Sequence, residues 1–219
     1  MASTHPTDKL VSLYASGEAT EGVALAVAAH LTYCPSCRAR VEQAEAIAAA
    51  LMTSDQSDDA LELPNIGAVL ARLDDDEAGM MEAEAPCASA SKLDAGPLPT
   101  AVSAKVGLNF AEIPWRFRLP GVSEYEMTSS EGDSISLLRV KPGVAIPQHT
   151  HEGEELTVVF SGVLEDGGIS YGVGAMSVAD HDVDHHPRAG AGEVCICLAV
   201  VSGGLRFTGR FGRALNLFS

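Results

Sequence analysis

The stretch His30-Leu-Thr-Tyr-Cys34-Pro-Ser-Cys37 brings one imidazole and two thiols close together in the chain, at the spacing H-x3-C-x2-C. Pro35 suits the first turn of a helix, because its missing N–H would be unpaired in that position anyway. Thiolates and a neutral imidazole are preferred zinc ligands, and a structural zinc site takes four of them. We therefore predict that this stretch binds zinc and fixes the packing of the helices around it.

Apolar residues at helical spacing predict helices on both sides of this stretch. Helices are expected over Thr7–Ser16, over about Thr20–Leu31 and over Pro35–Leu51. A fourth is expected over Leu63–Leu73, where one apolar stripe can pack on the other three helices or clamp a partner. Residues 1–75 are therefore predicted to form a small four-helix zinc domain.

A fourth zinc ligand has to come from elsewhere, and His5 is the only other histidine in the N-terminal half. We therefore predict that a first zinc site is formed by His5, His30, Cys34 and Cys37. The alternative is a redox dithiol, because C-x-x-C at a helix start is also the thioredoxin-type arrangement. No βαβ pattern surrounds the two cysteines, which favours zinc. The interpretations overlap, since zinc-bound thiolates remain oxidisable.

The composition of the chain changes after the predicted helices. Residues 76–104 collect acidic residues, alanine, serine and proline without a sustained period, which is typical of a linker. From residue 105 to residue 219, short alternating runs are broken by glycine and proline, and this pattern predicts a sandwich or barrel. The clearest strands are expected over Ile135–Val140, Leu156–Phe160, Ala175–Val178 and Val194–Val201. The predicted fold class is α+β multidomain, with a helical zinc domain, a linker and an all-β barrel.

A second metal motif, G-x5-H-x-H-x3-E-x6-G, runs from Gly143 to Gly162. In a strand, His149 and His151 would point to the same face, about 6.6 Å apart along the strand. Glu155 would return on the next strand, and a fourth ligand is expected from a later one, for which His185 is the candidate. The sequence therefore predicts a second metal site inside the barrel.

Charge and composition restrict the partners. The net charge of −16, from 30 acidic and 14 basic residues, disfavours direct binding to nucleic acid and favours a basic protein partner. The N-terminus lacks the pattern of a signal peptide, and the longest apolar run, Val23–Ala29, is too short to span a bilayer. Five cysteines without an export signal indicate metal or redox chemistry. We therefore expect a cytoplasmic protein without a membrane partner.

Cys195 and Cys197 share one face of a predicted strand. Small buried apolar residues are the common role of such cysteines. The alternative is a thiol pair near the metal that reacts with oxidants, and we keep both cysteines as candidate redox residues.

The motif from Gly143 to Gly162 resembles the first metal motif of the cupin superfamily at every fixed position. The second cupin motif is matched less well: Gly174 and His185 fit it approximately, but no downstream asparagine completes it. Together with the N-terminal motif and the acidic linker, this barrel makes the whole chain similar to the ChrR family of zinc-binding anti-sigma factors. The resemblance is specific, because two unrelated metal motifs occur in the expected order.

The resemblance implies that the helical domain binds an extracytoplasmic-function sigma factor, blocks its use by RNA polymerase and needs zinc to do so. It implies that the cupin holds a second zinc and is needed for the response to singlet oxygen and organic hydroperoxides, which releases the sigma factor. The first zinc would be bound by His5, His30, Cys34 and Cys37, and the second by His149, His151, Glu155 and His185.

An enzyme is the alternative: a cupin dioxygenase or isomerase with an accessory zinc domain. The ligand types of the second site accept zinc, iron and manganese alike, so they do not decide between the two. Catalysis would need an exchangeable coordination position and a substrate pocket. The N-terminal motif favours the regulator, because an enzyme has no evident use for it.

Overall fold

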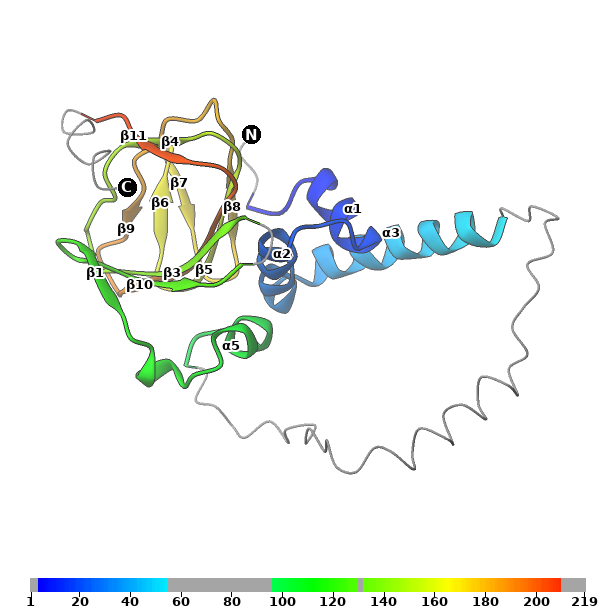
Figure 1. Cartoon of the computed structure of the whole chain (residues 1–219), viewed down its shortest axis with the longest axis horizontal. Helices are drawn as coiled ribbons and strands as arrows, with labels where there is room; N and C mark the ends of the chain where they lie inside the picture. The colour runs from blue at the N-terminus through cyan, green and yellow to red at the C-terminus, as the bar shows by residue number, and fades with distance from the viewer. Residues whose placement is uncertain (1–3, 55–95, 130–131, 210–219) are drawn as a thin grey trace.

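The computed structural model describes residues 4–54, 96–129 and 132–209. Three helices follow one another on one side of the molecule: α1 (Asp8–Ser16), α2 (Glu21–Tyr33) and α3 (Pro35–Ser54) (Figure 1). They agree with the first three predicted helices, whereas the fourth, Leu63–Leu73, lies outside the described residues. Within the ranges that the structure describes, no helix has both the length and the apolarity needed to cross a membrane.

Capping residues set the ends of these helices. The Thr7 hydroxyl accepts a hydrogen bond from the backbone of Leu10 and caps α1, which ends at Gly17 in the left-handed conformation. Thr20 caps α2 in the same way. Cys34 is the C-cap of α2 and is followed directly by the first residue of α3, so the two helices meet in a tight junction. This junction carries the H-x3-C-x2-C motif.

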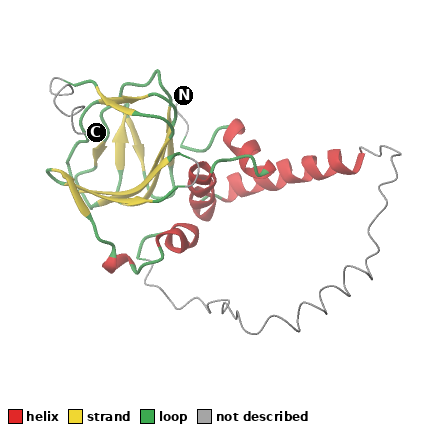
Figure 2. Cartoon of the chain, viewed as in Figure 1, coloured by secondary structure: helices red, strands yellow, loops and turns green. Residues whose placement is uncertain are grey.

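The C-terminal part forms a β-barrel of antiparallel strands, as predicted (Figure 2). A large sheet has the strand order β1-β2-β3-β10-β5-β8, and smaller sheets of order β7-β6-β9 and β11-β4 face it. The bounds of the strands are β1 Arg116–Leu119, β2 Val122–Met127, β3 Ser134–Val140, β4 His149–His151, β5 Glu155–Ser161, β6 Leu164–Asp166, β7 Ile169–Tyr171, β8 Met176–Ala179, β9 Arg188–Ala189, β10 Cys195–Val201 and β11 Leu205–Phe207.

The central strands β5 and β10 of the large sheet are buried on both faces, which explains their nearly continuous apolar runs. On β10, Cys195 and Cys197 belong to the barrel interior together with Val140 and Val159. Their neighbours, exemplified by Leu198, belong to a second core outside the barrel. Alternate residues of one strand therefore serve two different cores.

Helices cover the outer face of the large sheet. Buried residues of α2, among them Val27, share one apolar core with Leu198 and Val200 of β10. A further helix, α5 (Thr100–Val106), adds Val102 to the same core and is followed by a short 3-10 helix. The prediction that the linker extends to residue 104 is therefore wrong, because Leu98 is already buried in this core. Most of the predicted linker lies outside the described residues.

Candidate metal centres

The first cluster forms where α1, α2 and α3 meet. His30 lies on the last turn of α2, Cys34 in the junction, Cys37 on the first turn of α3, and His5 just ahead of α1. One ligand atom from each of these residues lies within 4.8 Å of the others. The structure thus brings together the four residues that the sequence predicted for this site.

The distances in the first cluster fit zinc. His5 Nδ1 lies 3.4 Å from the Sγ atom of Cys34 and 3.5 Å from that of Cys37. Tetrahedral zinc, with its usual bond lengths to nitrogen and sulfur, places such atoms about 3.6 Å apart. A donor set of two thiols and two imidazoles is also that of a closed structural zinc site.

The tautomer and orientation of the His30 ring suit cation binding. Its Nδ1 lies 2.7 Å from the carbonyl oxygen of Gly174, and because a carbonyl can only accept, Nδ1 must carry the proton. The Nε2 atom therefore holds a lone pair, and this buried atom has no hydrogen-bond partner among the described residues. A buried polar atom without a partner is costly, and a metal ion at the cluster would satisfy it.

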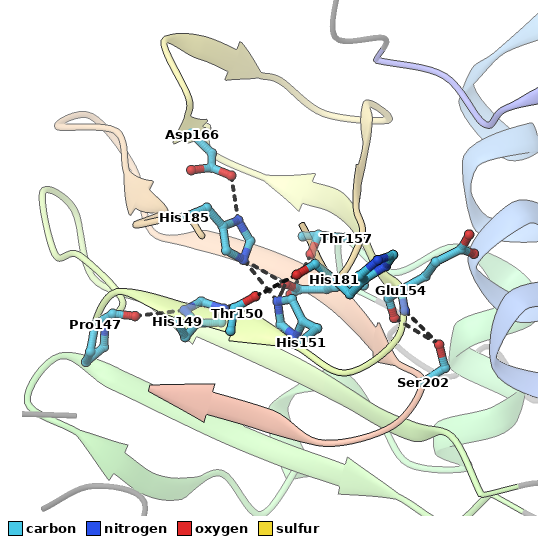
Figure 3. A network of polar contacts seen from close by, with 11 residues as sticks. Pro147, His149, Thr150, His151, Glu154, Thr157, Asp166, His181, His185 and Ser202 are labelled. Atoms are coloured by element: carbon cyan, nitrogen blue, oxygen red, sulfur yellow. Dashed lines mark hydrogen bonds and ion pairs between the residues drawn. The ribbon is translucent and has the colours of Figure 1, made fainter. Parts of the chain in front are cut away.

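The second cluster lies inside the barrel, and Figure 3 shows its histidines converging. His149 and His151 form the two ends of β4, Glu155 begins β5, and His185 lies in the segment between β8 and β9. An isolated bridge pairs His149 with His185 and holds the two segments together. All four predicted ligands are buried or nearly so, and their ligand atoms lie within 4.8 Å of one another.

Three imidazole nitrogens surround one carboxylate oxygen in this cluster. Oε2 of Glu155 lies 2.8 Å from Nε2 of His151, 3.2 Å from that of His185 and 3.7 Å from that of His149. The Nε2 atoms of His151 and His185 are 3.1 Å apart. Nitrogen and oxygen ligands of tetrahedral zinc lie about 3.3 Å apart, so a divalent cation fits among these atoms.

Two of these rings are oriented by partners that the sequence did not reveal. His149 Nδ1 lies 2.7 Å from the carbonyl oxygen of Pro147, and His185 Nδ1 lies 2.7 Å from the carboxylate of Asp166. Both partners accept, so each ring keeps Nε2 for the cluster. Sequence reasoning missed Asp166, because β6 supplies it from outside either motif.

Comparison with known proteins assigns the chain to a family. A zinc-finger family model matches residues 7–38, and the ChrR cupin-like domain family matches residues 103–203. The anti-sigma-E factor ChrR of Cereibacter sphaeroides is 34% identical over 204 residues, which are 93% of this chain and 91% of that protein. The chain belongs to the ChrR family of anti-sigma factors.

A solved structure agrees with this assignment. The crystal structure of Rhodobacter sphaeroides SigE in complex with the anti-sigma ChrR includes a chain that is 30% identical, with a TM-score of 0.74. The match covers 90% of this chain and 98% of that chain. These findings confirm the resemblance drawn from the sequence. Membership of the ChrR family makes the chain a regulator and sets aside the enzyme alternative.

The two thiols of the first cluster differ in acidity in this ChrR-family chain. Burial would raise the pKa of Cys34, but hydrogen bonds from Ser36 and Cys37 outweigh it and lower this pKa to about 7. Burial and the neighbouring Cys34 raise the pKa of Cys37. A metal would draw both thiols into the thiolate form, and Arg40 Nη1, 3.5 Å from Cys37 Sγ, favours that form.

The second cluster carries opposite charges at close range. Burial would raise the pKa of Glu155, but the three histidines beside it hold this pKa well below its usual range. Burial would lower the pKa of His185, but Asp166 and Glu155 raise it to about 9. The cluster therefore combines a carboxylate with a positive charge, and a bound metal cation would take the place of the His185 proton.

A cavity of about 400 Å³ adjoins the second cluster. His149 and Glu155 form part of its wall, and most of the remaining lining is apolar, including Ile146 and Phe207. An ion pair between Arg118 and Glu124, 2.7 Å apart, also belongs to the lining. Small molecules can therefore approach two of the ligands from inside the barrel.

Cys195 and Cys197 are buried side by side in the barrel interior of the ChrR-family fold. A hydrogen bond between the two thiols lowers the pKa of Cys195. The same bond, burial and the negative charge of Glu155 raise the pKa of Cys197 well above its ordinary value. The charge of Glu155 thus acts on one thiol of this pair, that of Cys197.

Proposed function

We propose that this chain inhibits an extracytoplasmic-function sigma factor in the cytoplasm and releases it in response to singlet oxygen or organic hydroperoxides. The observation that carries the proposal is the match to the anti-sigma ChrR in the SigE complex, which extends over both the helical part and the barrel. In this proposal, residues 1–75 form the sigma-binding domain and residues 105–219 the sensing barrel.

The far half of α3 supports sigma binding by the helical part. This helix projects away from the barrel (Figure 1). Ile47, Leu51 and Met52 are 55%, 65% and 81% exposed, although all three are large and apolar. Apolar side chains gathered on a projecting helix are typical of a surface that a partner covers. The net charge of −16 favours a basic partner surface, such as that of a DNA-binding protein.

The first cluster is proposed to hold a structural zinc, with His5, His30, Cys34 and Cys37 as ligands. Its place at the junction of three helices supports this role, because a metal there fixes the direction in which α3 leaves the junction. Zinc at this position would therefore shape the surface offered to the sigma factor.

The second cluster is proposed to be the sensing site, with His149, His151, Glu155 and His185 holding zinc, or iron or manganese in its place. The adjoining cavity supports this role, because it gives a small oxidant access to His149 and Glu155. When bound, the metal would act as a Lewis acid on a hydroperoxide oxygen by expanding its coordination from four to five ligands. Asp166 would keep His185 oriented throughout.

Cys195 and Cys197 are proposed as an additional oxidant-reactive pair. A hydroperoxide would take two electrons and two protons from the thiols, giving a disulfide, an alcohol and water. Neighbours on the same strand face lie about 6.6 Å apart, near the upper limit for the Cα atoms of a disulfide. The bond would therefore pull on β10, which passes beneath α2.

Metal analysis of the full chain purified with its co-eluting partner tests the proposal. Two metal ions and a sigma factor are the expected result, and singlet oxygen or an organic hydroperoxide should then dissociate the complex. A chain that binds no sigma factor from the same cells would contradict the inhibitor function. A complex that is stable to both oxidants would contradict the sensing function alone.

A further inference from the structure

The turn between β7 and β8, residues 172–175, touches the first metal cluster although it belongs to the barrel. Its Gly174 carbonyl accepts the 2.7 Å hydrogen bond from the buried Nδ1 of His30. The next strand begins with a second contact, in which the backbone N–H of Met176 donates to the carbonyl of Thr4 over 2.9 Å. Thr4 directly precedes His5. The barrel therefore contacts the chain at both histidines of the first cluster or beside them.

The turn between β7 and β8 lies very close to the end of α2. Gly174 has a φ of +83°, a conformation that residues with a side chain rarely adopt. A Cβ atom added there would lie 2.4 Å from Cβ of Tyr33, at the end of α2. Only glycine therefore lets the turn reach the last turn of the helix, where His30 lies.

The Gly174 carbonyl is also firmly held. The backbone N–H of Gly174 donates to the carbonyl of Val159 on β5 over 2.8 Å, and Val159 donates in turn to the carbonyl of Ala175. The β5–β8 ladder continues from Val158 opposite Met176 to Glu155 opposite Ala179. The acceptor of the His30 bond thus lies in the turn that leads into the strand pair carrying Glu155.

We propose that the Gly174 carbonyl is a positioning group of the first metal site, so that the barrel completes a site whose ligands all lie in the helical part. It holds the His30 ring in the tautomer and orientation that present Nε2 to the metal. The inference rests on the proposed metal binding by the first cluster. Partners of this kind, which orient a ligand from outside the metal shell, typically contribute about 10- to 100-fold to metal affinity.

Cobalt(II) bound to the full chain can report on each site separately. The first cluster contains thiolates and gives sulfur-to-cobalt charge-transfer absorption, whereas the second cluster offers only nitrogen and oxygen ligands. Gly174→Ala is the test variant. Gly172→Ala is the matched control, because a Cβ there meets nothing within 4 Å and its φ is not positive.

Gly174→Ala should weaken cobalt binding at the thiolate site by about 10- to 100-fold and leave binding at the second site unchanged. Gly172→Ala should bind cobalt at both sites like the unaltered chain. Unchanged affinity of the thiolate site in Gly174→Ala would overturn the proposal. If the unaltered chain shows no charge-transfer absorption, the metal-binding proposal itself fails, which is a different outcome.

Gly174→Ala can also disturb the barrel, in which case both sites lose cobalt. NMR of the imidazole nitrogens in the unaltered zinc-bound chain then decides. His30 is expected to show a slowly exchanging Nδ1–H and a metal-bound Nε2. A rapidly exchanging Nδ1–H, or a proton on Nε2, would refute the positioning role whatever the variant does.

Discussion

The two clusters bring their ligand residues together in opposite ways. In the first, His30, Cys34 and Cys37 lie within one short stretch, and the helix junction brings them together. In the second, the ligands come from β4, β5 and the segment before β9, so the site exists only when the barrel is closed. The first offers thiols at helix ends, and the second offers nitrogen and oxygen atoms beside a cavity. Ligand chemistry and surroundings thus support the proposed difference in role, in which a metal in the first cluster would shape a surface and one in the second would meet small molecules.

Breaking the first cluster should have the largest effect. Cys34→Ser is expected to remove one of the two metal ions and to abolish the sigma complex. Structural zinc contributes on the order of 10 kcal/mol to the folding of small zinc domains, and an incomplete ligand set forfeits much of it. Metal analysis and co-purification would measure both losses. Ser16→Ala, at an exposed serine at the end of α1 and outside the four ligands, is the control and should keep both metal ions. A metal-free Cys34→Ser chain that still binds sigma would refute the structural role.

Removing the metal from the second cluster should impair oxidant sensing and leave sigma binding intact. His149→Ala is expected to lose the barrel metal, to keep sigma affinity within about fivefold and to remove most of the oxidant response of the complex. Binding assays before and after hydroperoxide treatment would measure this. His181→Ala is the matched control, because that histidine is exposed and lies outside the four-ligand cluster. If His149→Ala loses sigma binding and His181→Ala keeps it, the second site is needed for binding itself, and the proposed separation of binding from sensing is wrong.

A smaller effect is expected at Asp166, which is not a ligand itself and contacts the ligand His185. Asp166→Asn keeps an oxygen that can accept from His185 Nδ1 but removes the charge. Metal affinity of the barrel site should fall by about 10- to 100-fold, while the thiolate site keeps its affinity. Competition with a chelator would measure both values. Asp182→Asn, at an exposed aspartate in the same part of the barrel, should change neither.

The smallest effect is expected from the buried thiol pair. Cys197→Ala should leave sigma binding and both metal ions in place, because no ligand is lost. The oxidant response should become slower without disappearing, since the metal site remains. Release kinetics after hydroperoxide addition would measure this, with Cys195→Ala expected to behave alike. A response that vanishes completely in either variant would show that the thiols, and not the metal, sense the oxidant.

Local patterns predicted most of this molecule. The first three helices, the main strands and six of the eight clustered ligand residues follow from spacing, capping and alternation within short windows. The other two, His5 and His185, were candidates chosen among the few remaining histidines. The sequence did not predict α5, because residues 96–104 have a linker-like composition and become buried only through contact with α2 and the large sheet. Asp166 and the Gly174 carbonyl were missed for a related reason. Their partners are His185 and His30, and only tertiary folding brings each pair together.

The apolar layer between α2 and the large sheet has a consequence for how such chains can evolve. Gly22 of α2 lies so close to β10 that an added Cβ would come within 2.6 Å of Val200. Val27 of the same helix and Leu198 of that strand are fully buried in one core, so separating the halves would expose both to water. The chain should therefore melt in one cooperative transition. A helical half grafted from a relative onto this barrel would need the matching strand surface, so substitutions on α2 and β10 are expected to be coupled.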